Sequence, residues 1–182
     1  MKDSEAVRLR RPVFLIGLPG VGKTTLGRAL AERTGVAFVD LDEAVEADAG
    51  KSVAEIFATE GEAGFRARET AMLRRYADAA AVVACGGGTP CQPGNMELMN
   101  TTGTSVWLQA PDELLAARIL QQPGQRPMFC CGEAEVLPRL QALAERRRPF
   151  YARAAHTFDA SALDDVEGIR ALVGRFLDAF MR

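Results

Sequence analysis

The chain has 182 residues, 48% of them hydrophobic, and a formal net charge of −2 at pH 7. This length fits one domain with a buried core, and the slightly acidic balance argues against a nucleic-acid-binding surface. No apolar run approaches the length of a membrane span, and the charged N-terminus lacks the apolar segment of a secretory signal. Four cysteines without C-x-x-C spacing and a single histidine predict reduced thiols, no zinc site and a cytoplasmic protein.

The first half of the chain predicts a tail, two strands and a group of helices. Residues 1–11 are polar and aperiodic, so we expect a flexible tail before a single domain over 12–182. The predicted elements that follow are a strand at about 12–17, a helix at 23–34, a strand at 36–39, and helices at 42–49, 52–59 and 62–78. Gly35, Gly50 and Gly61 separate the helices, as glycine commonly does at helix ends.

The second half of the chain alternates strands and helices. It predicts strands at 80–85 and 105–108, a helix at 112–120, a polar stretch at 121–133, a helix at 134–147, a strand at 156–158 and a helix at 165–181. The run at 80–85 is apolar throughout, which is typical of a strand buried on both faces of a parallel sheet. We end the helix at 147 because Pro149 follows. The alternation predicts an open, doubly wound α/β sheet.

The strongest motif is the segment GLPGVGKT at residues 17–24, which lies between an apolar strand and a helix. Its glycines allow several backbone N–H groups to converge on phosphate oxygens, and the helix N-terminus adds positive potential. In such a loop, Lys23 reaches the outer phosphates and Thr24 offers its hydroxyl to Mg²⁺. A chance glycine turn before a helix is the alternative, but strand, spacing, lysine and threonine all agree. The motif predicts a nucleoside-phosphate site.

Two carboxylates, Asp40 and Asp42, follow the second predicted strand, at the sheet edge where such folds bind ligands. Residues two apart on an extended segment point the same way, so both could face the phosphate loop and serve Mg²⁺ and an acceptor hydroxyl. The alternative is that one of them only caps the next helix. The chain has no Asn-Lys-x-Asp segment for guanine and no strand ending in Asp-Glu. Phosphoryl transfer to a small acceptor is therefore favoured over a nucleotide switch.

Two further features point to an acceptor site. Arg66 and Glu69 share a helix face, so Glu69 can hold the guanidinium ready to bind a carboxylate, beside the apolar Phe65. A surface ion pair is the alternative. The run Gly86-Gly87-Gly88 follows a buried strand. Three glycines cost chain entropy there, and close approach of a ligand to backbone N–H groups is a reason for them.

Taken in order, these motifs resemble those of the shikimate kinase family, whose members are P-loop enzymes similar to nucleoside-monophosphate kinases. The resemblance covers about residues 12–162 and rests on residues 17–24, 38–42, 65–69, 86–88, 126–127 and 147–151. It implies a five-stranded parallel sheet of order 2-3-1-4-5, a helical substrate-binding region at about 41–70 and a mobile lid at about 121–133. It also implies transfer of the γ-phosphoryl of ATP, with Mg²⁺, to the 3-hydroxyl of shikimate, in the pathway to chorismate and aromatic amino acids.

The resemblance implies roles for single residues. Asp42 corresponds to the residue that orients the acceptor hydroxyls or acts as a base, and Lys23 and Arg126 complete the catalytic set. Nucleotide contacts are implied for Gly20, Val21, Gly22, Lys23, Thr24, Thr25, Arg118 and Arg126, and Mg²⁺ contacts for Thr24 and Asp40. Shikimate contacts are implied for Asp42, Val53, Phe57, Phe65, Arg66, Gly87, Gly88 and Arg147. For Arg118, a surface role is an equal alternative.

Two other functions remain open. A kinase for a different polyol acid, such as gluconate, would share the phosphate loop but need not combine Arg66, Glu69, the three glycines and Arg147. A non-catalytic ATP-binding module would be expected to lack Asp42 or Lys23, and both are present. The chain departs from the family pattern in the lid, where Met128-Phe129 replaces the usual aliphatic pair and Cys130-Cys131 follows. The cysteines favour a packing role. We expect a monomer without nucleic-acid or membrane partners.

Overall fold

The structure is a computed structural model that describes residues 9–122 and 129–180. Its centre is a parallel sheet of five strands in the order β2-β3-β1-β4-β5. The strands are β1 (Val13–Ile16), β2 (Ala37–Asp40), β3 (Ala81–Ala84), β4 (Thr104–Gln109) and β5 (His156–Asp159). The predicted order is therefore confirmed. Every residue of β1 and β3 is buried, and since successive side chains point to opposite faces, both faces of the sheet are covered.

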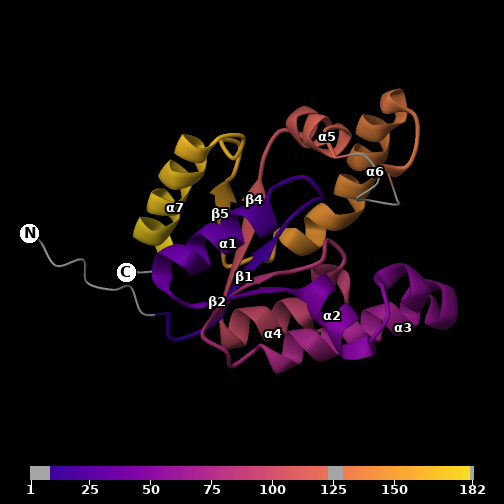
Figure 1. The fold of residues 1–182 in the computed structure, drawn as a ribbon, viewed down its shortest axis with the longest axis horizontal. Coiled ribbons are helices and arrows are strands. Elements are labelled where there is room, and N and C mark those ends of the chain that lie inside the picture. The colour runs from indigo at the N-terminus through magenta and orange to yellow at the C-terminus, as the bar shows by residue number, and fades with distance from the viewer. Residues whose placement is uncertain (1–8, 123–128, 181–182) are drawn as a thin grey trace, which may run out of the picture.

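The helices pack in pairs around this sheet (Figure 1). They are α1 (Lys23–Thr34), α2 (Leu41–Ala49), α3 (Val53–Arg75), α4 (Asn95–Thr102), α5 (Asp112–Leu120), α6 (Glu133–Tyr151) and α7 (Val166–Phe180), with a short 3₁₀ turn, η1 (Thr89–Cys91). Helix α1 packs against α7, α2 against α3, and α5 against α6, while α4 packs on β4. Strands β1, β2 and β3 all end at the edge of the sheet where α1, α2 and η1 begin, so residues from distant parts of the chain meet there.

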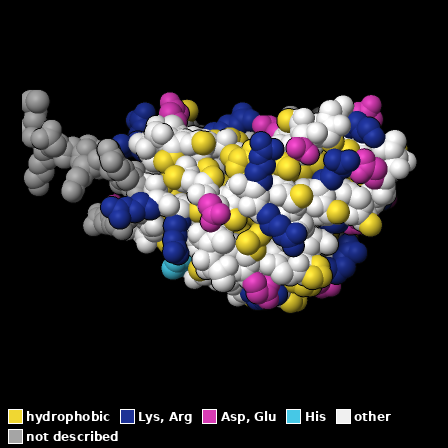
Figure 2. All heavy atoms as spheres, turned by 90° about the horizontal axis from the view of Figure 1, so that it is seen from below, with side chains coloured by type: hydrophobic (Ala, Val, Ile, Leu, Met, Phe, Trp, Pro, Cys, Tyr) yellow, Lys and Arg dark blue, Asp and Glu magenta, His cyan; other side chains and the backbone are white. Residues whose placement is uncertain are grey.

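Glycines end or break the helices as predicted. Helix α1 stops at Gly35, whose backbone is left-handed (φ 74°) and whose N–H donates to the Ala31 carbonyl. Gly61 (φ 72°, ψ −178°) interrupts α3 at the boundary expected between two helices. On the face turned toward the viewer in Figure 2, acidic and basic side chains are interspersed and the hydrophobic side chains are scattered. Within residues 9–122 and 129–180, no helix has both the length and the hydropathy needed to cross a membrane.

One expectation about the helices was wrong, and one helix was not predicted. Helix α6 does not end at residue 147 but runs through Pro149 to Tyr151. Pro149 and Glu145, whose carbonyl loses its N–H partner, are both exposed, so water can satisfy that carbonyl. Residues 89–104 carried no assignment, yet they hold η1 and α4. Helix α4 has only eight residues between Gly94 and Gly103, which is too short for a clear periodic pattern.

Candidate active site

The phosphate loop has the backbone that its sequence predicts. Gly17, Gly20 and Gly22 all have positive φ values, of 148°, 84° and 94°, so side chains at these positions would be strained. Gly22 caps α1, and no acidic residue lies in the first turn of that helix, which leaves its N–H groups and dipole available to an anion. The Lys23 ammonium donates to the Gly17 carbonyl at 2.9 Å and to the Leu18 carbonyl at 3.2 Å. The lysine thus lies across the loop that it follows.

Asp40 is the last residue of β2, and each of its two carboxylate oxygens accepts hydrogen bonds from a different part of the chain. Oδ1 accepts the backbone N–H of Asp42 at 3.1 Å and that of Glu43 at 3.5 Å, which caps α2. Oδ2 accepts the hydroxyl of Thr24 at 3.0 Å, across from the phosphate loop. The capping role raised as an alternative is therefore real, but it uses only one oxygen. The other oxygen stays beside the threonine of the phosphate loop.

Asp42 lies in the first turn of α2, not on an extended segment as expected. The strand ends at Asp40 because that residue already caps the helix, so the geometry of residues two apart on a strand does not apply. Asp42 is partly buried, and its pKa is raised from 3.8 to about 6. Burial is the largest cause, followed by the negative charges of Glu69 and Asp40, while the cations Lys23 and Arg66 oppose the rise.

The turn Gly86–Gly88 has four charged groups packed directly against it: Glu69 and Asp42 at Gly86, Arg147 at Gly87 and Arg66 at Gly88. A methyl group on Gly88 would lie 2.6 Å from the guanidinium carbon of Arg66, and one on Gly87 would overlap the guanidinium of Arg147. A methyl group on Gly86 would lie 2.9 Å from the Asp42 carboxylate. None of the three glycines has a positive φ. They are needed because side chains approach the backbone closely, and these side chains come from α2, α3 and α6.

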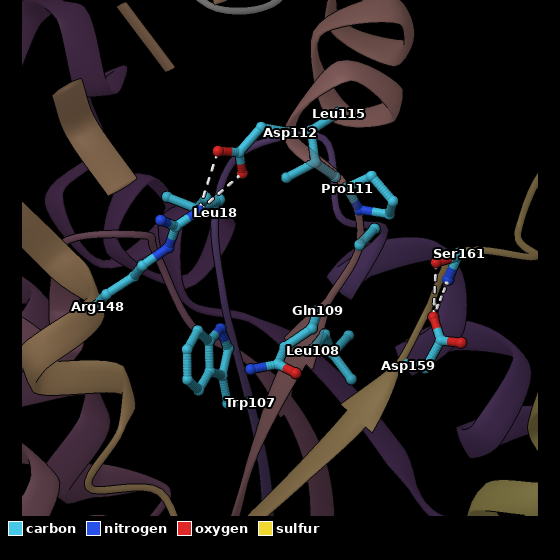
Figure 3. A pocket seen from close by; sticks show the side chains of 11 residues that line it. Leu18, Trp107, Leu108, Gln109, Pro111, Asp112, Leu115, Arg148, Asp159 and Ser161 are labelled. Atoms are coloured by element: carbon cyan, nitrogen blue, oxygen red, sulfur yellow. Dashed lines mark hydrogen bonds and ion pairs between the residues drawn. The ribbon is translucent and has the colours of Figure 1, made fainter. Parts of the chain in front are cut away.

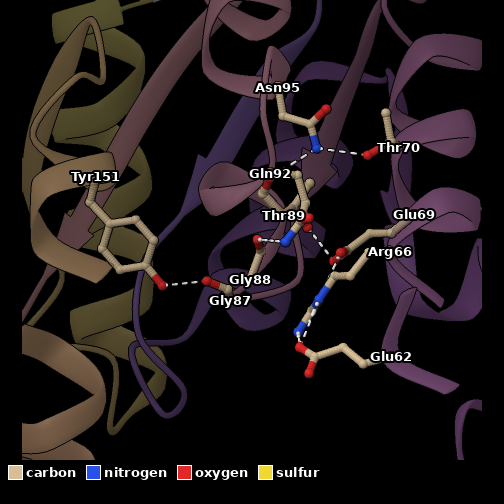
Figure 4. A network of polar contacts seen from close by, with 10 residues as sticks. All are labelled: Glu62, Arg66, Glu69, Thr70, Gly87, Gly88, Thr89, Gln92, Asn95 and Tyr151. Carbon is tan, nitrogen blue, oxygen red and sulfur yellow. Dashed lines mark hydrogen bonds and ion pairs between the residues drawn. The ribbon is translucent and has the colours of Figure 1, made fainter. Parts of the chain in front are cut away.

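A buried network holds Arg66 in place (Figure 4). Its Nη1 donates to Glu69 Oε2 at 2.9 Å, and the Thr89 hydroxyl donates to the other oxygen of Glu69. Asn95 donates to the Thr89 carbonyl at 2.9 Å and to the Thr70 hydroxyl at 3.1 Å. Glu69 is fully buried and the Arg66 side chain is 18% exposed. The predicted contact is confirmed, and the pair is not a surface ion pair.

Sequence reasoning missed Thr89 and Asn95, because both act through contacts with a helix about twenty residues earlier in the chain. Their only local signal is that they follow the glycine turn. Both side chains are polar and buried, and buried polar groups need partners. Here their partners include the ion pair that orients Arg66.

Arg147 and Tyr151 lie one turn apart on α6, and both face Gly87. The Tyr151 hydroxyl lies 2.6 Å from the Gly87 carbonyl oxygen and 3.2 Å from that of Gly17. Helix α6 therefore reaches both the glycine turn and the phosphate loop.

Phe57 and Phe65 form an apolar pair on α3, with ring centroids 4.9 Å apart. Phe65 is buried beneath the Arg66 guanidinium, while Phe57 is 39% exposed. Val53, at the start of α3, is partly buried. The outer ring of the pair is the one that a ligand could touch.

Comparison with known proteins decides the family. The shikimate kinase family model matches residues 19–177. A shikimate kinase of Symbiobacterium thermophilum is 48% identical over 158 residues, which cover 85% of this chain and 90% of that relative. The chain belongs to the shikimate kinase family.

Solved structures of shikimate kinases agree with this fold. The enzyme from Bacteroides thetaiotaomicron superposes with a TM-score of 0.88 at 39% identity, covering 92% of this chain and 97% of that one. The enzyme from Acinetobacter baumannii, solved in complex with shikimate, gives a TM-score of 0.83 at 34% identity, covering 96% and 95%. The P-loop kinase fold expected from the motifs is therefore present along nearly the whole chain.

Of the two other arginines with implied roles, Arg118 lies among the described residues and Arg126 does not. Arg118 is 13% exposed and binds the segment after β5: it contacts both carboxylate oxygens of Asp164, and it donates to the Ser161 carbonyl at 2.6 Å. It therefore connects α5 to that segment. Arg126, with the rest of residues 123–128 in the lid expected at 121–133, lies outside the described residues.

A separate cavity of about 360 Å³ lies under Leu18, between the end of β4 and the start of α5 (Figure 3). Trp107 and Gln109 form one wall, and at the rim Arg148 donates to both oxygens of Asp112, at 2.9 and 3.1 Å. Among the residues that the structure describes, none of those with implied roles lines this cavity. The site built from the three glycines is thus distinct from it.

Proposed function

We propose that this chain transfers the γ-phosphoryl group of ATP to the 3-hydroxyl of shikimate and releases ADP and shikimate 3-phosphate. The observation that carries the proposal is that Arg66, Arg147 and Asp42 pack against consecutive glycines of one turn. Two guanidinium groups and one carboxylate match an acceptor that has a carboxylate at one end and hydroxyls at the other. Membership of the shikimate kinase family supports the same acceptor.

Arg66 and Arg147 act as the clamp for the acceptor carboxylate. A planar guanidinium matches two carboxylate oxygens, and Arg66 is already held by Glu69 at 2.9 Å, so little ordering is needed when the anion binds. The N–H groups of Gly87 and Gly88 lie at the same turn and add donors. Phe57 covers the apolar side of the ring, supported by Phe65 beneath it.

Asp42 binds the acceptor hydroxyl and accepts its proton. With a pKa of about 6, the carboxyl group is mostly ionised at neutral pH and still basic enough for this role. The groups that perturb its pKa include Lys23 of the phosphate loop and Arg66 of the clamp. Asp42 therefore lies within electrostatic reach of both the donor side and the acceptor side of the reaction.

The phosphate loop holds ATP. The N–H groups of Gly20, Val21, Gly22, Thr24 and Thr25 bind phosphate oxygens, and Lys23 exchanges its loop carbonyls for the outer phosphates. Arg118 contacts the adenine side and Arg126 stabilises the transferring group. In phosphoryl transfer the protein contributes mainly positioning and charge stabilisation.

Thr24 and Asp40 would hold Mg²⁺. Both present oxygen atoms, 3.0 Å apart, on the two sides of the phosphate loop, and this donor set suits a hard cation. Across residues 9–122 and 129–180, no three His, Cys, Asp or Glu side chains form a metal cluster. That fits an ion that takes its other ligands from phosphates and water. When bound, Mg²⁺ neutralises charge on the phosphates.

The proposal includes a single kinase domain over 12–182 after a flexible tail, with a substrate-binding region at 41–70 and a lid at 121–133. It also includes a cytoplasmic monomer that acts on a small molecule and binds neither nucleic acid nor membranes.

A coupled ADP-release assay tests the function, with shikimate, quinate and gluconate compared at equal concentration. We expect turnover with shikimate to exceed turnover with the other two. Faster turnover with gluconate would favour the other polyol-acid kinase, and no ADP release with any acceptor would favour a non-catalytic ATP-binding module.

A further inference from the structure

Tyr151 contacts both halves of the proposed site at their carbonyl groups. Its side chain is fully buried at the end of α6, with its ring beside that of Trp107 at 5.9 Å between centroids. Its hydroxyl has one proton and lies near two acceptors, the Gly87 carbonyl at 2.6 Å and the Gly17 carbonyl at 3.2 Å. Figure 4 shows the hydroxyl pointing at Gly87, on the opposite side of the glycine turn from Arg66.

Gly17 and Gly87, the residues that carry these two carbonyls, each also contact a positively charged side chain of the proposed site. The Gly17 carbonyl accepts the Lys23 ammonium at 2.9 Å, and Gly87 packs against the Arg147 guanidinium. Gly17 is the first residue of the phosphate loop, 134 positions from Tyr151 in the chain. The hydroxyl therefore joins the loop proposed to bind the phosphoryl donor to the turn proposed to bind the acceptor.

We propose that the Tyr151 hydroxyl is a positioning group that fixes the spacing between the phosphate loop and the glycine turn, and with it the alignment of donor and acceptor. The inference rests on the proposed function. Burial raises the pKa of this phenol above its usual value, so the hydroxyl keeps its proton over the working pH range. Its one proton can therefore be donated to the Gly87 carbonyl or shared with the Gly17 carbonyl throughout that range.

The inference predicts a specific kinetic pattern. Without the hydroxyl, the phosphate loop keeps its own N–H donors, and the clamp keeps both arginines although Arg147 loses one hydrogen-bond partner, so each substrate still binds. What changes is the alignment of the reacting groups, and a displacement of about 1 Å can cost about a hundredfold in rate. Loss of the hydroxyl should therefore lower kcat while both KM values stay nearly unchanged.

The test is Tyr151→Phe, which removes one oxygen and keeps the ring. We expect kcat to fall on the order of ten- to a hundredfold at a temperature well below Tm. Tyr76→Phe makes the same change at the other tyrosine of the chain and should leave kcat unchanged. Trp107→Phe changes the packing around the Tyr151 ring but keeps the hydroxyl. It should lower Tm and leave kcat nearly unchanged.

Several results would overturn the inference. An unchanged kcat in folded Tyr151→Phe, or a loss expressed only in KM, would do so, as would an equal loss of kcat in Trp107→Phe. A wild type that releases no ADP with shikimate would refute the proposed function and this inference together, so the two failures are distinguishable.

If Tyr151→Phe does not fold, a fluorinated tyrosine at position 151 provides the test. This residue keeps the hydroxyl, but its phenol is more acidic. We expect its kcat to decline with rising pH as the phenol ionises, while the wild type shows no such decline. Coincident pH profiles of the two proteins would refute the role of the hydroxyl.

Discussion

The substitution Asp42→Asn should make the protein more stable and much less active. In the folded protein the Asp42 carboxyl has a pKa of about 6, against 3.8 ordinarily. Between these values the folded chain binds a proton that the unfolded chain has lost, so the stability contributed by this group is present at low pH and is lost as pH rises through 6. The rise corresponds to about 3 kcal/mol of unfolding free energy.

Asparagine has the same size and does not titrate. The unfolding free energy of the variant minus that of the wild type should therefore grow by about 3 kcal/mol between about pH 3.5 and about pH 7.5. Taking this difference cancels the titration of the carboxyl groups that do not interact with Asp42. Turnover with saturating shikimate should fall by about 10²–10⁴-fold, the usual contribution of a general base.

Urea unfolding at a series of pH values, with a chelator and without nucleotide, gives the free energies by linear extrapolation. Asp48→Asn is the matched control, because Asp48 lies on the same helix but its side chain is 44% exposed. The reasoning is refuted if the Asp42→Asn difference does not change with pH, or if the variant is the less stable protein at neutral pH. Near-normal turnover would remove Asp42 from the chemistry.

Three further predictions concern the clamp, the glycine turn and the metal. Arg66→Ala and Arg147→Ala should each weaken shikimate binding, measured by calorimetry, by about 2–5 kcal/mol while ADP binding stays intact. An equal loss of affinity for an analogue without the carboxylate would show that the arginines are structural. Gly88→Ala keeps an allowed backbone but pushes Arg66 away, so the KM for shikimate should rise and, because the buried pair with Glu69 is disturbed, Tm should fall, and an unaffected KM would contradict this placement. Asp40→Asn should raise the Mg²⁺ concentration needed for half-maximal turnover, and an unchanged titration would exclude Asp40 from metal binding.

Local sequence was enough to predict the backbone of the phosphate loop and the bounds of two helices. Helices α1 and α5 have the predicted bounds, because glycine or proline lies within three residues of each of their ends. The backbone of the phosphate loop also follows from its own glycines, whose positive φ values need no distant partner. The strand order, by contrast, came from resemblance to a family, since periodicity does not say which strands are neighbours.

Sequence reasoning was wrong or silent where a neighbouring residue changed the local rule. Pro149 did not end α6, since Glu145, the residue whose carbonyl it leaves without a partner, is exposed. Asp42 was expected to share an extended segment with Asp40 after the strand, but Asp40 caps a helix that begins one residue later. Helix α4 was too short to show a period.

Only the tertiary structure decided how the site is assembled. The sequence could suggest that Glu69 holds Arg66, since they are three residues apart on a helix, but not that Thr89 binds the other oxygen of Glu69. Nor could it place the Tyr151 hydroxyl against Gly17 and Gly87, which lie 134 and 64 positions away. Such contacts depend on how strand ends from distant parts of the chain meet at one edge of the sheet. A local pattern specifies an element, whereas the distance between two elements is set by the packing of the whole core.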